Sequence, residues 1–439
     1  MTPPPTAAGV GWTAAPHEEM RRTTGKPLLP QDDPFYEPPN GYAALAPGTI
    51  LRSREVELAL VGLVPQKVTA WQLLVRSTDL NGKAEAYVTT LLTSPDADPT
   101  APRPLLSYQC AIDAVSSRCM PSHSLQRGAA VVGASPQFEL LLIMGAIARG
   151  WAVAIPDHEG TRGHWGAPRE PGYRVLDGIR AAMRFEPLGL SADTKVGLWG
   201  YSGGGLASSW AAEMATDYAP ELDVVGAVLG SPVGDPGSTF LRLNGTVFSG
   251  LPALVIAGLR RVYPELDRII LNHANVAGLA LTKSIESEST LSALRKLAKF
   301  DIGDYSDIPL ADLLALPEMV EVFEDIQVGM TMPNMPLFVL QGVHDQVIAI
   351  DDVDGQVSRY VKGGVHVTYL RDRLSEHVTL HPIATPAALN WLADRFDGVP
   401  PPEAATKTVW STAFTAPAAF WGLLEMGWVA AKVALGRKI

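Results

Sequence analysis

The chain has little cysteine and no excess of basic residues. Only Cys110 and Cys119 occur among 439 residues, too few for a disulfide-stapled small scaffold or for a zinc or iron–sulfur centre built on cysteine. Lys and Arg number 35 against 46 Asp and Glu, a formal net charge of −11. Nucleic-acid binding requires cations that neutralise phosphates, so we expect no nucleic-acid partner.

The sequence also lacks a recognisable export signal and a clean membrane-spanning run. Residues 1–20 begin with a proline cluster in place of the basic start and apolar stretch of a secretory signal. Residues 409–431 contain only one charge, Glu425, but a proline and two glycines interrupt them. We therefore expect a cytoplasmic protein or one that is peripheral to a membrane.

Metal-ligand motifs are missing as well. No H-E-x-x-H or similar spacing occurs, and the nine histidines are scattered along the chain. We expect neither a metal nor a cofactor.

The sequence does have abundant apolar residues, at 47% against 18% charged, which is typical of a globular protein. Short β-type runs open the ordered part, and strands then alternate with helices. This alternation predicts parallel βαβ units in an α/β fold. The expected strands are 57–64, 70–77, 86–94, 104–110, 151–157, 196–202, 224–232, 336–342 and 365–372, and the expected helices between and after them are 138–150, 173–185, 205–215 and 385–396.

Composition along the chain predicts four regions. Residues 1–48 are rich in proline and polar groups, which indicates an irregular arm. The sheet and its helices take up 49–234 and 334–398. Between them, residues 235–333 are helical in pattern with no convincing strand, and so long an insertion predicts a helical cap. Residues 399–439 form a C-terminal tail or flap.

The sharpest motif is Gly200-Tyr201-Ser202-Gly203-Gly204, which fits the pattern G-x-S-x-G. It lies between a predicted strand and a predicted helix, the context that gives this pattern meaning. Small residues at 200 and 204 allow a strained turn that exposes Ser202, and the N–H of Gly203 then faces a developing oxyanion. An incidental serine in a Gly-rich turn is the alternative.

A serine nucleophile needs a histidine base and a carboxylate that holds it. Asp345 follows the predicted strand 336–342, where this fold places its acid, and His377 follows the next strand by a short loop. The competitors lie further from a strand end or inside a strand. They are the loop carboxylates Asp351, Asp352 and Asp354, and the histidines His366 and His381.

At these motifs the chain resembles the secretory lipase family of α/β-hydrolases, the fungal lipase A type, from about residue 33 to 398. The resemblance is carried by several segments in order. They are DPFY at 33–36, PGTILRSR at 47–54, AWQLLVRSTDLNGKAEAYVTTLLTSP at 70–95, SYQCAID at 107–113, PDHEGTRG at 156–163, LDGIRA at 176–181, GYSGG at 200–204 and SEHVT at 375–379.

The resemblance implies an α/β-hydrolase fold and a catalytic triad of Ser202, Asp345 and His377. It also implies an oxyanion hole formed by the backbone N–H groups of Asp113 and Gly203. A capping role for the Asp113 carboxylate is the alternative, and the two roles are compatible because the hole needs only the N–H.

Two further features border this region. The loop that contains Asp157 and Glu159 leaves a strand at the same sheet edge, and Glu159 either touches substrate or supports the elbow. Cys110 and Cys119 bracket the Asp113 loop. A disulfide between them would rigidify that loop and stabilise the fold by a little under ~3 kcal/mol, and a pair of buried thiols is the alternative.

The resemblance implies that the segment 235–333 covers the site and houses an acyl chain, and its apolar composition fits lipophilic acyl groups. In the tail, Phe420, Leu424, Trp428 and Ala431 recur at helical spacing before basic residues. This pattern fits a helix packed on the core, a flap, or a peripheral contact with a lipid interface. A membrane span is the remaining alternative.

Together these observations predict a serine carboxylic-ester hydrolase, of the lipase or esterase type, acting on lipophilic esters through an acyl-enzyme. Two other functions fit the same residues. One is an acyltransferase that uses the same triad, and the other is a hydrolase homologue that binds a hydrophobic ligand without turnover.

Overall fold

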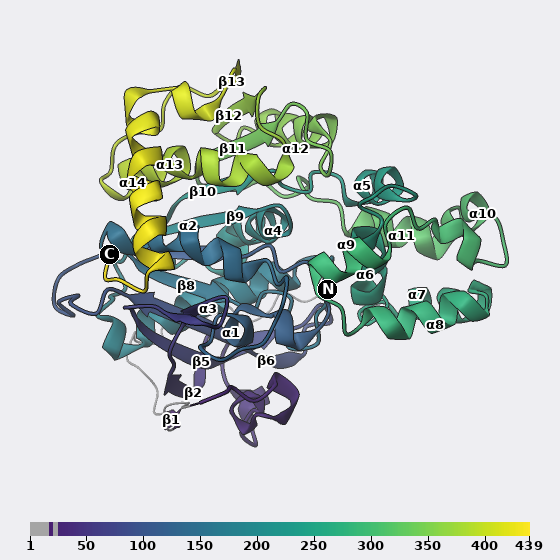
Figure 1. The fold of residues 1–439 in the computed structure, drawn as a ribbon, viewed down its shortest axis with the longest axis horizontal. Helices are drawn as coiled ribbons and strands as arrows, with labels where there is room; N and C mark the ends of the chain where they lie inside the picture. The colour runs from purple at the N-terminus through teal and green to yellow at the C-terminus, as the bar shows by residue number, and fades with distance from the viewer. Residues whose placement is uncertain (1–16, 21–24) are drawn as a thin grey trace.

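The computed structural model describes residues 17–20 and 25–439. An eleven-stranded sheet forms its centre (Figure 1), in the order β1-β2-β5-β6-β8-β7-β9-β10-β11-β12-β13. The pairs formed by β2, β5, β6 and β8 are antiparallel, and the pairs from β8 and β7 to β13 are parallel. The strands are β1 (Glu18–Glu19), β2 (Ile50–Glu55), β5 (Thr69–Thr78), β6 (Ala84–Thr93), β7 (Leu105–Gln109), β8 (Ala152–Pro156), β9 (Val196–Tyr201), β10 (Val224–Gly230), β11 (Leu337–Gly342), β12 (Val367–Asp372) and β13 (Ala405–Val409).

Helices cover both faces of the sheet, as continuous apolar strands require. One apolar cluster joins the sheet to α3, α4 and α12, and a second joins it to α2, α13 and α14. Alternate residues of β9 serve the two clusters: Leu198 packs with the first, and Trp199 and Tyr201 pack with the second. The helices are α1 (Pro121–Ser124), α2 (Pro136–Ala148), α3 (Glu170–Arg184), α4 (Gly203–Tyr218), α12 (Ile350–Lys362), α13 (His377–Phe396) and α14 (Pro417–Ala434).

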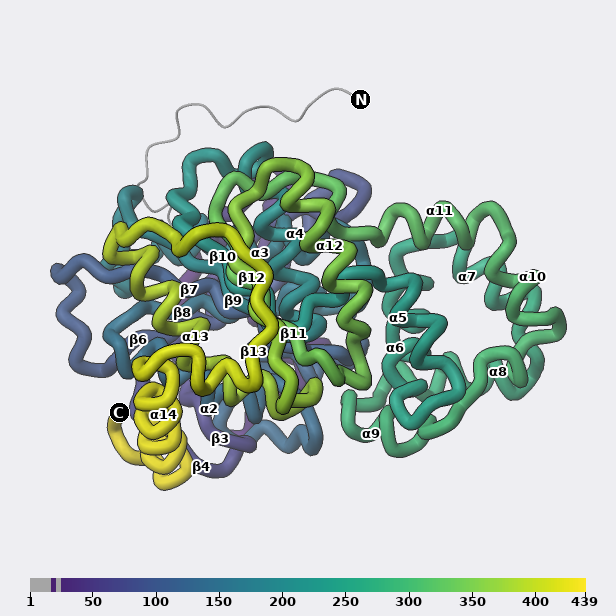
Figure 2. The backbone as a smooth tube through the Cα atoms, turned by 90° about the horizontal axis from the view of Figure 1, so that it is seen from above, coloured from purple at the N-terminus to yellow at the C-terminus, as the bar shows by residue number. Residues whose placement is uncertain are grey.

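The residues between β10 and β11 form a group of short helices at one side of the molecule (Figures 1 and 2). An ion pair between Arg169 and Asp325 (2.7 Å) ties this helical segment to the core. A second tie runs from the Thr290 hydroxyl to the carbonyl of Asp113 (3.0 Å). The helices are α5 (Pro236–Leu243), α6 (Gly250–Leu259), α7 (Pro264–His273), α8 (Val276–Ile285), α9 (Thr290–Lys296), α10 (Leu310–Leu314) and α11 (Pro317–Asp325).

The prediction of a single strand at 57–64 is wrong. This segment forms the small hairpin β3 (Ala59–Leu60) and β4 (Val64–Pro65), outside the main sheet. Val61 and Gly62 both adopt positive φ, at 47° and 74°, which reverses the chain in the middle of the apolar run. The strand that does enter the sheet is β2, immediately before it.

The C-terminal residues contribute both a strand and a helix. β13 pairs with β12, so the sheet extends beyond the residues predicted for the core. α14 lies on the outside of the molecule and packs against α13 and α2 (Figure 2). Among the described residues, no helix combines the length and apolar character that a membrane span needs.

Candidate active site

Ser202 lies on a sharp turn between β9 and α4. Its backbone is strained, with φ 54° and ψ −120°, and its N–H donates to the carbonyl of Gly230 (2.9 Å). Glycine is needed on either side: a Cβ on Gly200 would lie 2.0 Å from the carbonyl oxygen of Gly204, and a Cβ on Gly204 would lie 2.0 Å from that of Gln109. The motif therefore forms the strand–turn–helix elbow expected from its sequence context.

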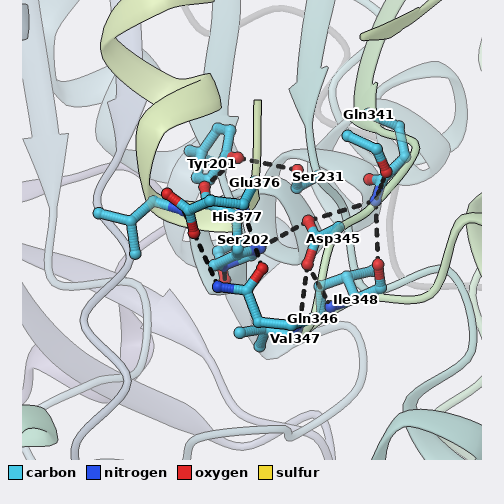
Figure 3. Close-up of polar contacts among 12 residues, drawn as sticks. Tyr201, Ser202, Ser231, Gln341, Asp345, Gln346, Val347, Ile348, Glu376 and His377 are labelled. Atoms are coloured by element: carbon cyan, nitrogen blue, oxygen red, sulfur yellow. Dashed lines mark hydrogen bonds and ion pairs between the residues drawn. The ribbon is translucent and has the colours of Figure 1, made fainter. Parts of the chain in front are cut away.

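His377 links Ser202 to Asp345 (Figure 3). The Nε2 of His377 lies 3.0 Å from the Ser202 Oγ, and its Nδ1 lies 2.7 Å from the Asp345 Oδ2. All three residues are buried, with 8 or 9% of each exposed. The structure thus brings together three residues separated by as many as 175 positions in the sequence.

Local contacts hold the acid and the histidine in place. Asp345 Oδ1 accepts from the N–H groups of Val347 (2.8 Å) and Ile348 (2.7 Å). Gln341 Nε2 donates to Asp345 Oδ2 at 3.2 Å. His377 is the first residue of α13, which begins with a capping box around Glu376. The three hydrogen bonds to Asp345 leave its carboxylate little freedom to move away from the imidazole.

The competing carboxylates lie elsewhere. The prediction that Asp351, Asp352 and Asp354 belong to a loop is wrong, because all three lie in α12. Asp354 accepts from the Tyr369 hydroxyl (2.9 Å) and forms an ion pair with Arg371 (2.8 Å). The structure therefore brings none of the three to His377.

The competing histidines also have other partners. His366 precedes β12, and its Nε2 lies 2.8 Å from the carbonyl of Pro402. His381 is stacked on the Tyr201 ring at 4.2 Å, and its Nε2 lies 3.0 Å from the Tyr108 hydroxyl. Burial and then the charge of His377 lower the pKa of His381 to about 3, so it stays neutral.

Tyr201 supports the backbone of His377. Its hydroxyl donates to the backbone carbonyl of His377 (2.5 Å) and accepts from the Ser231 hydroxyl (2.9 Å), as Figure 3 shows. One residue of the elbow motif thus positions the first turn of α13. The sequence indicated Tyr201 only through its place in the motif.

Asp113 lies beside Gly203, with φ 47°. A Cβ on Gly203 would come within 2.1 Å of Asp113 Oδ1, so the carboxyl group occupies the space that glycine leaves free. Among the described residues Asp113 Oδ1 has no hydrogen-bond partner. Burial raises the pKa of Asp113 to about 6, and the nearby His377 counteracts part of this rise.

The backbone N–H of Asp113 donates to the Glu159 carboxyl at 3.2 Å. Glu159 is buried, and burial followed by the charge of Asp113 raises its pKa well above the ordinary value. Through this contact Glu159 holds the Asp113 loop, and a contact of Glu159 with substrate stays a prediction. The same contact also occupies the N–H that the resemblance implies for an oxyanion hole.

Two other buried carboxyl groups hold the same region. Asp157 accepts from the backbone N–H of Ser122 (2.9 Å) and from its hydroxyl, and burial raises its pKa to about 7. Glu139 on α2 accepts from the N–H of Ala111 (2.9 Å) and from the Tyr108 hydroxyl (2.7 Å). Sequence reasoning missed Glu139, because its contact with the loop joins residues 28 positions apart.

The disulfide between Cys110 and Cys119 is not formed, and both are buried free thiols. They point into different apolar clusters. Cys110 packs with Tyr108 and Trp199 in the cluster beneath α2 and α13, and Cys119 packs with Ala114 in a small separate cluster. Hydrogen bonds that the loop N–H groups of Ala111 and Asp113 donate to Glu139 and Glu159, in place of a covalent bridge, hold the Asp113 loop.

One cavity lies beside Ser202, and a second cavity adjoins it. The first, of about 60 Å³, is lined by Ser202, Asp113 and Trp165 and by apolar side chains. The second, of about 120 Å³, lies within the helical segment and has mainly Leu, Ile, Val and Phe side chains in its walls. Four residues line both cavities, namely Pro236, Phe240, Val255 and Ile326.

No group of three His, Cys, Asp or Glu side chains within residues 17–20 and 25–439 is arranged to hold a metal ion. The described site consists of a serine, a histidine and carboxyl groups. This arrangement is suited to nucleophilic attack by Ser202 with proton transfer to His377.

Comparisons with known proteins show the family to which the chain belongs. The secretory lipase family model matches residues 125–404. A protein of Mycobacterium tuberculosis (strain CDC 1551 / Oshkosh), named "Probable inactive lipase MT1628", is 53% identical over 99% of this chain and 97% of its own length. Lipase A of Arthroderma benhamiae (strain ATCC MYA-4681 / CBS 112371) is 34% identical over 85% of this chain and 81% of its own length.

Solved structures give the same relationship. Lipase A of Candida antarctica matches with a TM-score of 0.83 and 26% identity, covering 94% of this chain and 98% of that one. The rice cell wall degrading esterase LipA from Xanthomonas oryzae shares the fold alone, with a TM-score of 0.61 and 14% identity over 88% of this chain and 98% of its own. The chain is an α/β-hydrolase and belongs to the secretory lipase family.

Proposed function

We propose that the protein is a serine hydrolase that cleaves lipophilic carboxylic esters through an acyl-enzyme. The observation that carries this proposal is the continuous hydrogen-bonded chain from Ser202 Oγ through His377 to Asp345, at 3.0 Å and 2.7 Å. These are the distances at which an imidazole takes a proton from a serine hydroxyl.

In the first half of the reaction Ser202 Oγ attacks the ester carbonyl carbon while His377 Nε2 accepts the hydroxyl proton. Asp345 stabilises the resulting imidazolium through the Nδ1 hydrogen bond. The tetrahedral intermediate then expels the alcohol, which takes the proton from Nε2. In the second half, water attacks the acyl-serine with the same base, and the carboxylic acid leaves.

Two N–H groups are proposed to bind the oxyanion. Gly203 begins α4, and the first N–H groups of a helix have no partner within it. Asp113 N–H is the second donor, and it must leave the Glu159 carboxyl to serve the substrate. Each donor contributes ~3 kcal/mol of transition-state stabilisation. We therefore expect substrate binding to shift either Glu159 or the 111–113 backbone.

The substrate class follows from the cavities. The cavity beside Ser202 adjoins an almost wholly apolar cavity in the helical segment, and Phe240 and Val255 are among the side chains that line both. An acyl chain fits such a space, whereas a charged substituent would lose its hydration there without finding partners. The helical segment 235–333 is thus proposed as a cap that holds the acyl chain.

A panel of p-nitrophenyl esters from acetate to palmitate tests the proposal. We expect turnover by the wild type, none by Ser202→Ala, and a fall of about 10⁴-fold in kcat for Asp345→Asn. Asp352→Asn, which changes a carboxylate of α12, is the matched control and should keep wild-type turnover. Equal loss in both aspartate variants, or full activity in Ser202→Ala, would refute the mechanism. Added alcohol, with free acid and new ester measured together, separates hydrolysis from acyl transfer.

Two observations favour a second function, a lipid-binding protein without turnover. The Asp113 N–H is engaged by Glu159, and the similar mycobacterial protein is named as probably inactive. A fluorophosphonate probe discriminates, since it labels a serine that a histidine activates. A folded wild type that resists labelling as completely as Ser202→Ala would favour the binding function.

A further inference from the structure

α14 carries two apolar faces, only one of which is covered. Its inner face, formed by Ala419, Gly422, Met426, Val429 and Val433, is buried against α13 and α2. Its outer face repeats at the same helical spacing but points away from the core. The outer residues are Trp421 (65% exposed), Leu424 (56%), Trp428 (64%) and Leu435 (66%). A helix on the surface of a water-soluble protein normally has polar residues at these outer positions.

The outer face continues beyond both ends of the helix. At the start of the helix, the rings of Phe414 and Phe420 are stacked, with their centroids 6.1 Å apart. The centroids of the Phe420 and Trp421 rings are 5.7 Å apart. At the end of the helix, the hairpin β3–β4 is fastened to α14 by a hydrogen bond from Gln66 to the Val433 carbonyl (3.0 Å). That hairpin exposes 80% of Leu63. We call these exposed residues, from Leu63 and from 414–435, the α14 surface.

The C-terminal segment that carries α14 is opposite in charge to the whole chain. Residues 405–439 contain four basic side chains and one carboxylate, Glu425, although the chain has a net charge of −11. The Lys432 ammonium group lies 5.5 Å from the centre of the Trp428 ring. Arg437 follows within two turns, and Lys438 forms an ion pair with Asp96.

We propose that the α14 surface docks on anionic lipid bilayers. Exposed Trp and Phe rings beside Lys and Arg match the boundary between headgroups and acyl chains, where aromatic rings sit and cations meet anionic phosphates. α14 is 18 residues long with one buried face, so it lies along the membrane rather than across it. A second copy of the chain is a poorer partner, because the interface would enclose Lys432 and Arg437 of both copies, and residues 405–439 supply only the Glu425 side chain to pair them.

Vesicle binding tests this proposal independently of catalysis. The Ser202→Ala protein is mixed with vesicles of phosphatidylcholine alone or with about 30 mol% phosphatidylglycerol, and bound protein is measured by sedimentation. We expect binding to the anionic vesicles, weakened by salt, with tryptophan emission shifted to shorter wavelength. Changing Lys432→Glu and Arg437→Glu should weaken that binding at least about tenfold.

Matched triple variants then locate the surface. Trp421→Ser with Leu424→Ser and Trp428→Ser removes the outer face and should abolish binding. The control changes three exposed residues of the helical segment, Leu271→Ser, Val276→Ser and Val320→Ser, and should bind as before. Circular dichroism and thermal midpoints confirm that each variant is folded.

Three results would overturn the proposal. The first is no binding of the unaltered protein to anionic vesicles at low salt. The second is binding lost in the helical-segment variant but kept in the α14 variant. The third is a dimer in solution that the α14 variant dissociates, without any binding to vesicles.

Discussion

Glu139 provides a sharp test of how buried acids hold the Asp113 loop. Its carboxyl group accepts from Ala111 N–H and from the Tyr108 hydroxyl, and 5% of the residue is exposed. Burial raises its pKa from 4.5 to about 8, although the two hydrogen bonds oppose that rise. In Glu139→Gln, the amide oxygen still accepts from Ala111, and Tyr108 turns its proton to the neutral Nε2 of His381, 3.0 Å away.

The sign of the pH effect follows from the direction of the pKa shift. The native state holds the Glu139 proton more tightly than the unfolded state does, so this residue lowers stability as pH rises from the unfolded to the native pKa. A rise of the Glu139 pKa from 4.5 to about 8 implies a loss on the order of 2 to 3 kcal/mol in the free energy of unfolding between about pH 6 and pH 9. Glu139→Gln has no such proton and should not show this part of the loss.

Urea unfolding at the two pH values measures the difference. The wild type should lose on the order of 2 to 3 kcal/mol more than Glu139→Gln across that range. The contributions of the other buried acids cancel because both proteins contain them. Glu425→Gln, which changes an exposed carboxylate of α14, should follow the wild type. Equal losses in wild type and Glu139→Gln would show that Glu139 is already ionised in the native state, which would refute the reasoning.

Three substitutions test the elbow and the cavities. Gly203→Ala places a Cβ 2.1 Å from Asp113 Oδ1 and should lower ester turnover by on the order of 10²-fold, with a thermal midpoint near that of the wild type. Gly204→Ala places a Cβ 2.0 Å from the backbone oxygen of Gln109, which cannot turn aside, and should lower the thermal midpoint strongly or prevent folding. Val255→Trp fills the junction of the two cavities and should abolish turnover of long-chain esters while short-chain esters react as before.

The central elements of the fold were predictable because local pattern and tertiary environment agree there. The strand predicted at 196–202 and the helix predicted at 205–215 correspond to β9 and to α4, since apolar residues fill one and small residues the other. In the segment 57–64 the local pattern and the tertiary environment disagree. Its composition is that of a strand, but the positive φ of Val61 depends on the packing of Gly62 against Ala129.

The candidate site was predictable to the extent that it follows chain order. Ser202, Asp345 and His377 each follow a strand of the same sheet, so the parallel topology brings them to one edge. Contacts that depend on side-chain packing were not predictable. The donation from Asp113 N–H to Glu159 crosses 46 positions, and no local signal distinguishes it from contact with substrate.

That one N–H determines how fast an ester hydrolase of this geometry can be. With Gly203 as the only available donor, the expected rate lies about 10² to 10³ below that of a site with two. The Glu159 carboxyl is held in a setting that favours its neutral form, and a neutral acceptor binds an N–H less strongly than a charged oxyanion does. The developing oxyanion therefore competes favourably with Glu159 for the Asp113 N–H. Transfer of this hydrogen bond from Glu159 to the oxyanion becomes easier at the stage of the reaction where the negative charge appears.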